Sequence, residues 1–193
     1  MNSPSTVTTE RLVLARHQPH DFDDCVAMWR DPAVVRLIRP TPFDESETWS
    51  RMLRYVGHWE FMEFGYWTIR TLAGGEFCGE IGFAYTHREV PAEYAGAPEF
   101  GCTLVQSAWG RNIAKEATHA ALGWMDQERG LNRTIALTAE ANRAAIALAQ
   151  SAGYVRRQQV PYEGHAFVLM ERGVDGQPHP PRPHTQLARP SSP

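Results

Sequence analysis

Residues 99–130 combine a strand, a glycine-containing turn and a helix, an arrangement that can hold an anion. Residues 99–105 alternate as a strand does, and residues 107–112 read Ser-Ala-Trp-Gly-Arg-Asn. Apolar residues then recur at helical spacing until Gly130. The first N–H groups of a helix lack internal partners and lie at the positive end of its dipole, so phosphates of a nucleotide or of coenzyme A could bind here. Taken alone, the pattern fits a plain strand–helix connection better, because short glycine turns are common.

Composition bounds the classes of protein to consider. The chain has 193 residues, 42% of them hydrophobic and 21% charged, as expected for one globular domain. The formal charge of −3 argues against general binding to nucleic acid or to anionic membranes. No apolar run approaches the roughly 20 residues that span a bilayer, and the N-terminus has no secretion signal. Cys25, Cys78 and Cys102 are odd in number and widely spaced, which predicts neither disulfides nor a metal site and favours the cytoplasm.

Hydrophobic periodicity predicts the elements that position this stretch. We expect strands over 11–16, 65–70, 76–85, 99–105, 133–139, 154–160 and 166–171. We expect helices over 21–31, 33–38, 44–60, 113–129 and 144–149, with Asp21 and Asp44 as N-caps of two of them. The pattern indicates an α+β fold, an α/β/α sandwich around a mixed, mostly antiparallel sheet of about six or seven strands.

The two ends of the chain differ from the rest. Residues 1–8 are polar and are expected to be flexible. Residues 173–193 are rich in proline and are expected to be disordered or extended, because such a segment buries little apolar surface. The folded domain is therefore predicted over residues 9–172.

Three local signatures, in this order and spacing, resemble the GCN5-related N-acetyltransferase (GNAT) superfamily. Residues 9–14 (Thr-Glu-Arg-Leu-Val-Leu) are similar to the opening strand of its branch of ribosomal-protein N-terminal-alanine/serine acetyltransferases. Residues 99–104 followed by 109–117 (Trp-Gly-Arg-Asn-Ile-Ala-Lys-Glu-Ala) are similar to its acetyl-CoA motif. Asn142, followed by Gly153-Tyr154, is similar to a third segment of that branch. The resemblance covers almost the whole chain except its ends.

The resemblance implies a fold, a co-substrate and a reaction. The sheet is expected to splay between its fourth and fifth strands, with the pantetheine arm of acetyl-CoA in the splay. The pyrophosphate is expected on the turn amides at the start of the helix that follows residue 112. The implied reaction moves an acetyl group from acetyl-CoA directly to a primary amine, a protein N-terminus or a small molecule, in a ternary complex. A monomer or homodimer is expected, with no metal.

The residues that the resemblance assigns to the coenzyme lie in the strand, the turn and a second loop. They are Cys102, Thr103, Leu104, Trp109, Gly110, Arg111, Asn112, Ile113, Ala114, Lys115 and Asn142. Asn112 departs from the family, which usually has glycine there, but asparagine tolerates a positive φ better than most residues. Arg111 would contact a phosphate or be solvated. Asn142 would bind the pantetheine arm, and its alternative role is a helix N-cap.

A further departure concerns the general acid. Many members place a tyrosine or a serine where this chain has Ala149 and Ala145, and Tyr154 receives no role from the sequence. Because a thiolate is a good leaving group, this loss should slow the reaction without forbidding it. Backbone amides of residues 100–103 could polarise the thioester carbonyl.

Glu99 is the best candidate for the general base, directly or through a water, because an attacking amine must lose a proton. Its alternative is a solvated carboxylate at a strand edge. His119 is better explained as a residue on the flank of its helix.

Two questions remain open at the level of sequence. The absent hydroxyl groups also suit a protein of this fold that binds coenzyme A without efficient catalysis. A Rossmann enzyme is a weaker alternative, because this chain lacks the Gly-x-Gly-x-x-Gly motif of that fold. The aromatic helix 44–60 is expected to pack in the core or to wall an acceptor cleft. The acidic residues beside it favour either a cationic acceptor or, more simply, a solvated face; they are Asp44, Glu45, Glu47, Glu60 and Glu63.

Overall fold

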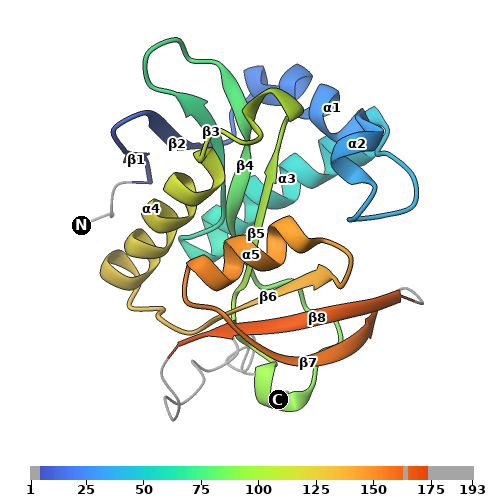
Figure 1. Ribbon diagram of the computed structural model, residues 1–193. Coiled ribbons are helices and arrows are strands. Elements are labelled where there is room, and N and C mark those ends of the chain that lie inside the picture. Colours follow the sequence, from blue (N-terminus) through green and yellow to red (C-terminus); the bar gives the residue numbers. More distant parts are fainter. Residues whose placement is uncertain (1–4, 163–164, 174–193) are drawn as a thin grey trace, which may run out of the picture.

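An eight-stranded mixed sheet forms the centre of the part of the chain that the computed structural model describes, residues 5–162 and 165–173 (Figure 1). In spatial order the strands run β1-β2-β3-β4-β5-β6-β8-β7. Their bounds are β1 Val7–Thr8, β2 Leu12–Arg16, β3 Tyr66–Thr71, β4 Phe77–Ala84, β5 Glu99–Leu104, β6 Thr134–Ala139, β7 Val155–Tyr162 and β8 His165–Arg172. Neighbours are antiparallel except β5 and β6, which are parallel. The predicted fold class is confirmed.

Strands β5 and β6 separate almost as soon as they meet. Their register contains only two residue pairs, Glu99 with Ile135 and Phe100 with Ala136. Beyond Phe100, the edge of β5 that faces β6 is therefore not paired with that strand. This is the splay that the resemblance implied.

Helices cover both faces of the sheet (Figure 1). Their bounds are α1 Phe22–Arg30, α2 Pro32–Val35, α3 Glu45–Met62, α4 Ile113–Glu128 and α5 Arg143–Ser151. The apolar stripe of α4 packs with α5 on the main core, where Ala117, Ala121 and Met125 are fully buried. A second cluster, with Trp29 and Met52 among its residues, joins α1, α2 and α3. No helix in the described ranges is long and apolar enough to cross a membrane.

Two of the three proposed helix caps form as expected. The Asp44 carboxylate accepts a hydrogen bond from the Glu47 amide at 2.7 Å and begins α3 in a capping box. Asn142 Oδ1 accepts from the Ala145 amide at 3.1 Å and begins α5. Asp21 occupies the N-cap position of α1, as predicted, but its side chain makes no capping hydrogen bond.

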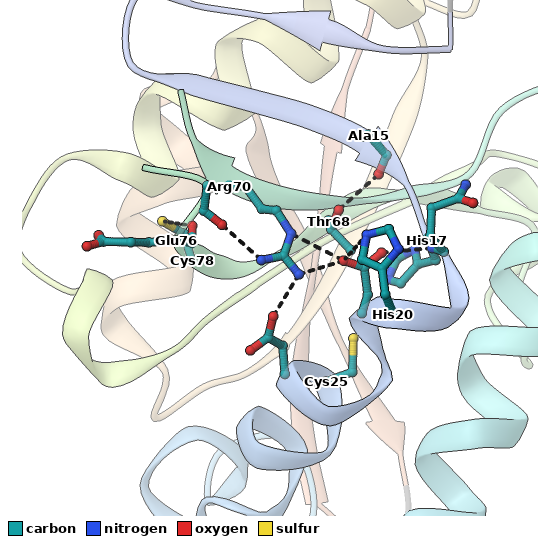
Figure 2. A network of polar contacts seen from close by, with 12 residues as sticks. Ala15, His17, His20, Cys25, Thr68, Arg70, Glu76 and Cys78 are labelled. Carbon is teal, nitrogen blue, oxygen red and sulfur yellow. Dashed lines mark hydrogen bonds and ion pairs between the residues drawn. The ribbon is translucent and has the colours of Figure 1, made fainter. Parts of the chain in front are cut away.

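The carboxylate of Asp21 instead accepts from Arg70 on β3. Figure 2 shows the Arg70 side chain reaching from the strand toward α1. Arg70 Nη2 lies 2.6 Å from Asp21 Oδ1 and 2.7 Å from Asp24 Oδ2, and Nη1 donates to the Gly75 carbonyl at 2.9 Å. Arg70 Nε and Nη2 both donate to Asp21 Oδ1, and such charge-assisted hydrogen bonds satisfy a buried carboxylate. This network fixes α1 against the sheet.

Other differences from the sequence analysis are small. Val7–Thr8 pairs with β2, although residues 1–8 were expected to be flexible. A two-residue strand is too short to carry a periodic signal. The predicted proline-rich tail lies, apart from Gly173, outside the described residues.

Candidate active site

A cleft of about 1040 Å³ is lined by residues of the helices α3 and α5 and of the strands β3 to β6. One half lies between the α2–α3 segment and the strands β3 to β5, and we call it the α3 half. The other half lies between β5, β6 and α5, where the two strands splay, and we call it the splay half. Glu99, Cys102, Thr103 and Asn142 all line this cleft, so the structure brings together four residues that the sequence had proposed.

Glu99 is at the junction of the two halves and is only 8% exposed. Its Oε2 accepts a hydrogen bond from Thr86 Oγ1 at 2.9 Å and lies 3.0 Å from Arg88 Nε. Burial raises the pKa of this carboxyl above its usual range, although Arg88 and Thr86 act in the opposite direction. Glu99 is therefore not a solvated residue at a strand edge, and its proton affinity suits a general base.

Gly101 makes room for an aromatic side chain, and its partner Gly82 makes room for the backbone at the start of β3. Gly82 on β4 pairs directly with Gly101 on β5. A methyl group on Gly101 would lie 2.2 Å from the hydroxyl oxygen of Tyr66, so the ring could not stay where it is. Tyr66 stacks on Tyr55 from α3 with ring centroids 4.4 Å apart. Burial raises the pKa of Tyr66, so its phenol stays protonated at neutral pH.

His58 also lines the cleft, but it cannot act as a base. One ring nitrogen, Nε2, accepts a hydrogen bond from the Tyr85 amide at 3.0 Å. The other, Nδ1, lies 2.6 Å from the Phe64 carbonyl and must donate to it. Both nitrogens are used, and burial lowers the pKa of this histidine. His58 is thus a neutral structural residue that joins α3 to the end of β4.

The open edge of β5 presents backbone groups to the splay half. The Val105 amide donates to the Cys78 carbonyl on the β4 side. Because successive amides in a strand point to opposite neighbours, the amides of Cys102 and Leu104 point toward β6. Cys102 lines the cleft and Leu104 does not. The Cys102 amide is therefore the donor best placed for a ligand in the splay.

The turn at the start of α4 has the conformation expected from Asn112. Its φ is 60° and that of Gly110 is 71°, so asparagine adopts the left-handed region in place of glycine. The Asn112 side chain does not cap the helix. Arg11 Nη1 donates to the Arg111 carbonyl at 3.2 Å, and Glu116 accepts from the Arg11 side chain at 2.7 Å. Arg11, which directly precedes β2, therefore braces the turn.

The turn before α4 lies outside the cleft, although β5 leads from one to the other. Leu104 and residues 109–115 do not line the cleft. Trp109 is 44% exposed, and Gly110, Arg111, Asn112 and Lys115 are exposed as well, whereas Ile113 is buried against the core. His119 is exposed on α4, as expected.

The family model of the acetyltransferase (GNAT) domain matches residues 11–155, which include every element just described from β2 to the start of β7. The chain belongs to the GNAT acetyltransferase family. It is 26% identical over 150 residues to the uncharacterised N-acetyltransferase p20 of Bacillus licheniformis, covering 77% of this chain and 82% of that protein.

Solved structures of GNAT proteins share the fold. A protein from Bordetella pertussis assigned to the GNAT family is 28% identical, with a TM-score of 0.78 over 88% of this chain and 100% of that chain. A ribosomal L7/L12 α-N-protein acetyltransferase, solved in complex with coenzyme A, is 15% identical with a TM-score of 0.73. It covers 89% of this chain and 99% of its own.

The positions that lack a hydroxyl group in this GNAT domain do line the cleft. They are Ala145 and Ala149 on α5. Tyr154 does not replace them, because its buried hydroxyl lies 2.6 Å from Thr134 Oγ1 in the core. Burial raises the pKa of the Cys102 thiol to about 12, so this cysteine is not a nucleophile at neutral pH.

Sequence reasoning did not assign roles to the cleft residues Arg51, Tyr55, Tyr66, Thr86 and Arg88. The spacing of Arg51 and Tyr55 was the one local signal, since residues four apart lie on the same helix face. Strand pairing brings Tyr66 to the cleft, and the β4–β5 loop brings Thr86 and Arg88.

Proposed function

We propose that this GNAT domain is an acetyl-CoA-dependent N-acetyltransferase that moves an acetyl group to a primary amine in a ternary complex. The observation that carries the proposal is the position of Glu99. Its buried carboxylate, with a raised pKa, lies where the α3 half of the cleft meets the unpaired edge of β5. An amine in the α3 half would then approach a thioester in the splay half beside a proton acceptor.

Residues on both sides of the splay fit the coenzyme. The Asn142 side chain lines the cleft, and only its oxygen is used in capping α5, which leaves the amide nitrogen for the pantetheine arm. The first amides of α4, beyond the strained turn at Asn112, suit the pyrophosphate. The fold accommodates such a ligand, since the L7/L12 acetyltransferase is bound to coenzyme A.

The chain supplies two catalytic functions in this proposal. Glu99 takes a proton from the ammonium form of the acceptor, directly or through a water, and the free amine attacks the thioester carbonyl. The Cys102 amide donates a hydrogen bond to the carbonyl oxygen as negative charge develops there. The C–N bond forms, the nitrogen gives up its second proton to water, and the C–S bond breaks; the departing thiolate takes a proton from water, so the two solvent transfers balance. No cysteine carries the acetyl group.

Ala145 and Ala149 favour a second candidate function, a protein that binds coenzyme A with little catalysis. The two functions share the cofactor site and differ in turnover. Three free cysteines are consistent with the cytoplasm, which we propose as the compartment of either.

Calorimetric titration with acetyl-CoA, followed by thiol release over a panel of primary amines, tests the proposal. We expect binding, and we expect release that depends on the amine and falls strongly in Glu99→Gln. Binding without release from any amine would favour the second candidate. No heat at millimolar acetyl-CoA would contradict both.

A further inference from the structure

The α3 half of the cleft is rich in arginine, although the chain as a whole carries a formal charge of −3. Four arginines and two glutamates are the charged residues of the cleft lining; they are Arg39, Arg51, Arg54, Arg88, Glu47 and Glu99. Both glutamates are already paired, one with Arg39 at 2.8 Å and the other with Arg88 at 3.0 Å. Among the residues that line the cleft, positive side chains therefore outnumber negative ones, and the charge of the buried Glu80, which acts on Arg51, offsets part of this excess.

Arg51 on α3 has no ion-pair partner within residues 5–162 and 165–173. Its guanidinium lies between aromatic rings, 4.1 Å from the centroid of Trp29 and 5.3 Å from that of Tyr55. Its Nε atom is buried and makes no hydrogen bond in the described structure. The Trp29 ring is itself fixed, because Nε1 donates to Glu80 at 3.0 Å. A guanidinium held this firmly in a partly dry site is well placed to bind an oxygen anion.

Tyr55 lies one helical turn after Arg51 and faces the same half of the cleft. It is 3% exposed, and its hydroxyl has no hydrogen-bond partner among the described residues. Leaving a buried hydroxyl without a hydrogen-bond partner is unfavourable. Burial raises the pKa of Tyr55, so the group remains an O–H donor. Arg51 and Tyr55 are interacting neighbours with unpaired donor atoms, and both suit the same ligand group, an anionic oxygen.

The acidic residues that flank α3 do not favour a cationic ligand. Glu45, Glu60 and Glu63 are paired with arginines outside the cleft, and Asp44 caps the helix. Only Glu47 lines the cleft, where its charge is already matched. These carboxylates stabilise the helix and its surroundings and leave no uncompensated negative charge from α3 in the cleft.

We propose that the acceptor is an amine that also carries an anionic oxygen group, a carboxylate or a phosphate, bound by Arg51 and Tyr55 while its amino group faces Glu99. This inference rests on the proposed function, whose base is in the same cleft. Arg51 and Tyr55 on α3 and Glu99 on β5 line the same cleft, so the two ends of one small molecule can meet both sets of groups. The charge of Arg51 also acts on Glu99, where it lowers the pKa against the larger effect of burial.

Matched amine pairs test this specificity through thiol release from acetyl-CoA. The pairs are glycine with glycinamide, phenylalanine with phenylalaninamide, and phosphoethanolamine with ethanolamine. Spermidine is assayed beside them as a purely cationic amine. We expect kcat/KM to be about 10- to 100-fold higher for the anionic member of a pair. Comparison of the carboxylate and phosphate arms identifies the group. A preference for the neutral members or for spermidine would overturn the proposal.

Variants of Arg51 and Tyr55 test whether these residues cause the preference for anionic amines. We expect Arg51→Met to abolish the preference by raising KM for the anionic member of each pair. Arg51→Lys should retain part of the preference, and Tyr55→Phe should reduce it severalfold while the ring stacking is kept. Arg36→Met is the matched control, since Arg36 is exposed outside the cleft, and it should leave the preference unchanged. Equal losses for both members of each pair in Arg51→Met, with a normal Arg51→Lys, would make Arg51 a structural residue.

An equilibrium measurement separates this proposal from the proposed function. N-acetylglycine and phosphoethanolamine are titrated into the wild-type protein and Arg51→Met in the presence of coenzyme A. If no amine is acetylated, binding that is lost in Arg51→Met still supports the anion site. Absent binding, or equal binding by the two proteins, contradicts the anion site even where turnover is found.

Discussion

Two buried glutamates lie on neighbouring strands and face the same side of the sheet, yet their environments differ. Glu80 on β4 is opposite Thr103, and Glu99 on β5 is opposite Ala84. Glu80 is 1% exposed and Glu99 is 8% exposed. Gly82 and Gly101 form the pair between them. The same residue type is thus placed twice on one face, and the two positions differ in their hydrogen-bond donors and in their access to the cleft.

Glu80 is surrounded by donors. It accepts from His17 Nε2 at 3.0 Å, Trp29 Nε1 at 3.0 Å and Cys25 Sγ at 3.3 Å. Burial acts to raise its pKa, but the hydrogen bond and charge of His17, helped by the charge of Arg51 and the thiol of Cys25, lower the pKa overall. The lowered pKa means that Glu80 stabilises the fold above the pKa of the unfolded state and loses that effect as pH falls through the folded pKa.

Glu99 has fewer donors and opens on the cleft. Burial dominates there, and its pKa is raised. A carboxyl with a raised folded pKa stabilises the fold only at low pH, and that effect is lost as pH rises through the folded pKa. At neutral pH the buried Glu99 carboxylate therefore lowers the free energy of unfolding, and the same burial raises its affinity for a proton. The comparison teaches that donor count, more than burial, separates a structural carboxylate from a reactive one in this domain.

The largest expected effect comes from removing the structural carboxylate. Glu80→Ala leaves three buried donors without an acceptor, and we expect it to lower the free energy of unfolding by about 3–5 kcal/mol in urea titrations. Glu80→Gln, which keeps one acceptor, should cost less. Near-wild-type stability of Glu80→Ala would show that the two glutamates are not distinguished by their donors.

Removing the reactive carboxylate should affect rate instead of stability. We expect Glu99→Gln to lower kcat about 100-fold, the lower end of the range for a general base, with little change in the Kd for acetyl-CoA. Its stability at neutral pH should equal or exceed that of the wild-type protein. A variant that lost coenzyme binding and turnover in parallel would make Glu99 structural, like Glu80.

A smaller effect is expected from removing one donor to Glu80. Trp29→Phe keeps a ring beneath Arg51 but deletes the indole N–H. We expect a loss of about 1–2 kcal/mol in the free energy of unfolding, with the pH dependence of the rate unchanged. Circular dichroism at several pH values should show this loss at neutral pH and a smaller one below pH 4.

The smallest predicted effect raises the pKa of Glu99 and so increases its difference from the pKa of Glu80. Arg88→Met removes a cation that lowers the pKa of Glu99. Because Arg88 is partly exposed, we expect the acidic limb of the pH–rate profile to rise by less than about one pH unit. A limb that moved to lower pH would contradict the assigned direction.

Much of the fold was predictable because its signals are local. Strand alternation, the Asp44 cap and the positive φ of Asn112 depend on neighbours in sequence, and all three were confirmed. Glu99 and Asn142 were found through the family motif and do line the cleft, while their roles remain predictions.

The rest depends on contacts between distant segments. Glu80 was not singled out, because its donors lie 51 to 63 residues away and come together only when α1 and the residue that follows β2 pack on β4. Arg51 and Tyr55 were read as part of an aromatic helix that packs in the core or walls a cleft. Periodicity places side chains on a face but does not show which of them lack a partner.

The pH dependence of kcat/KM for the wild-type protein and Glu99→Gln tests the central claim most directly. The account predicts an acidic limb in the wild-type profile with an apparent pKa above about 4.3, the usual value for glutamate, and no such limb in the variant. The same limb in both proteins would show that another group accepts the proton, and it would contradict the assignment of Glu99 as the reactive one of the two carboxylates.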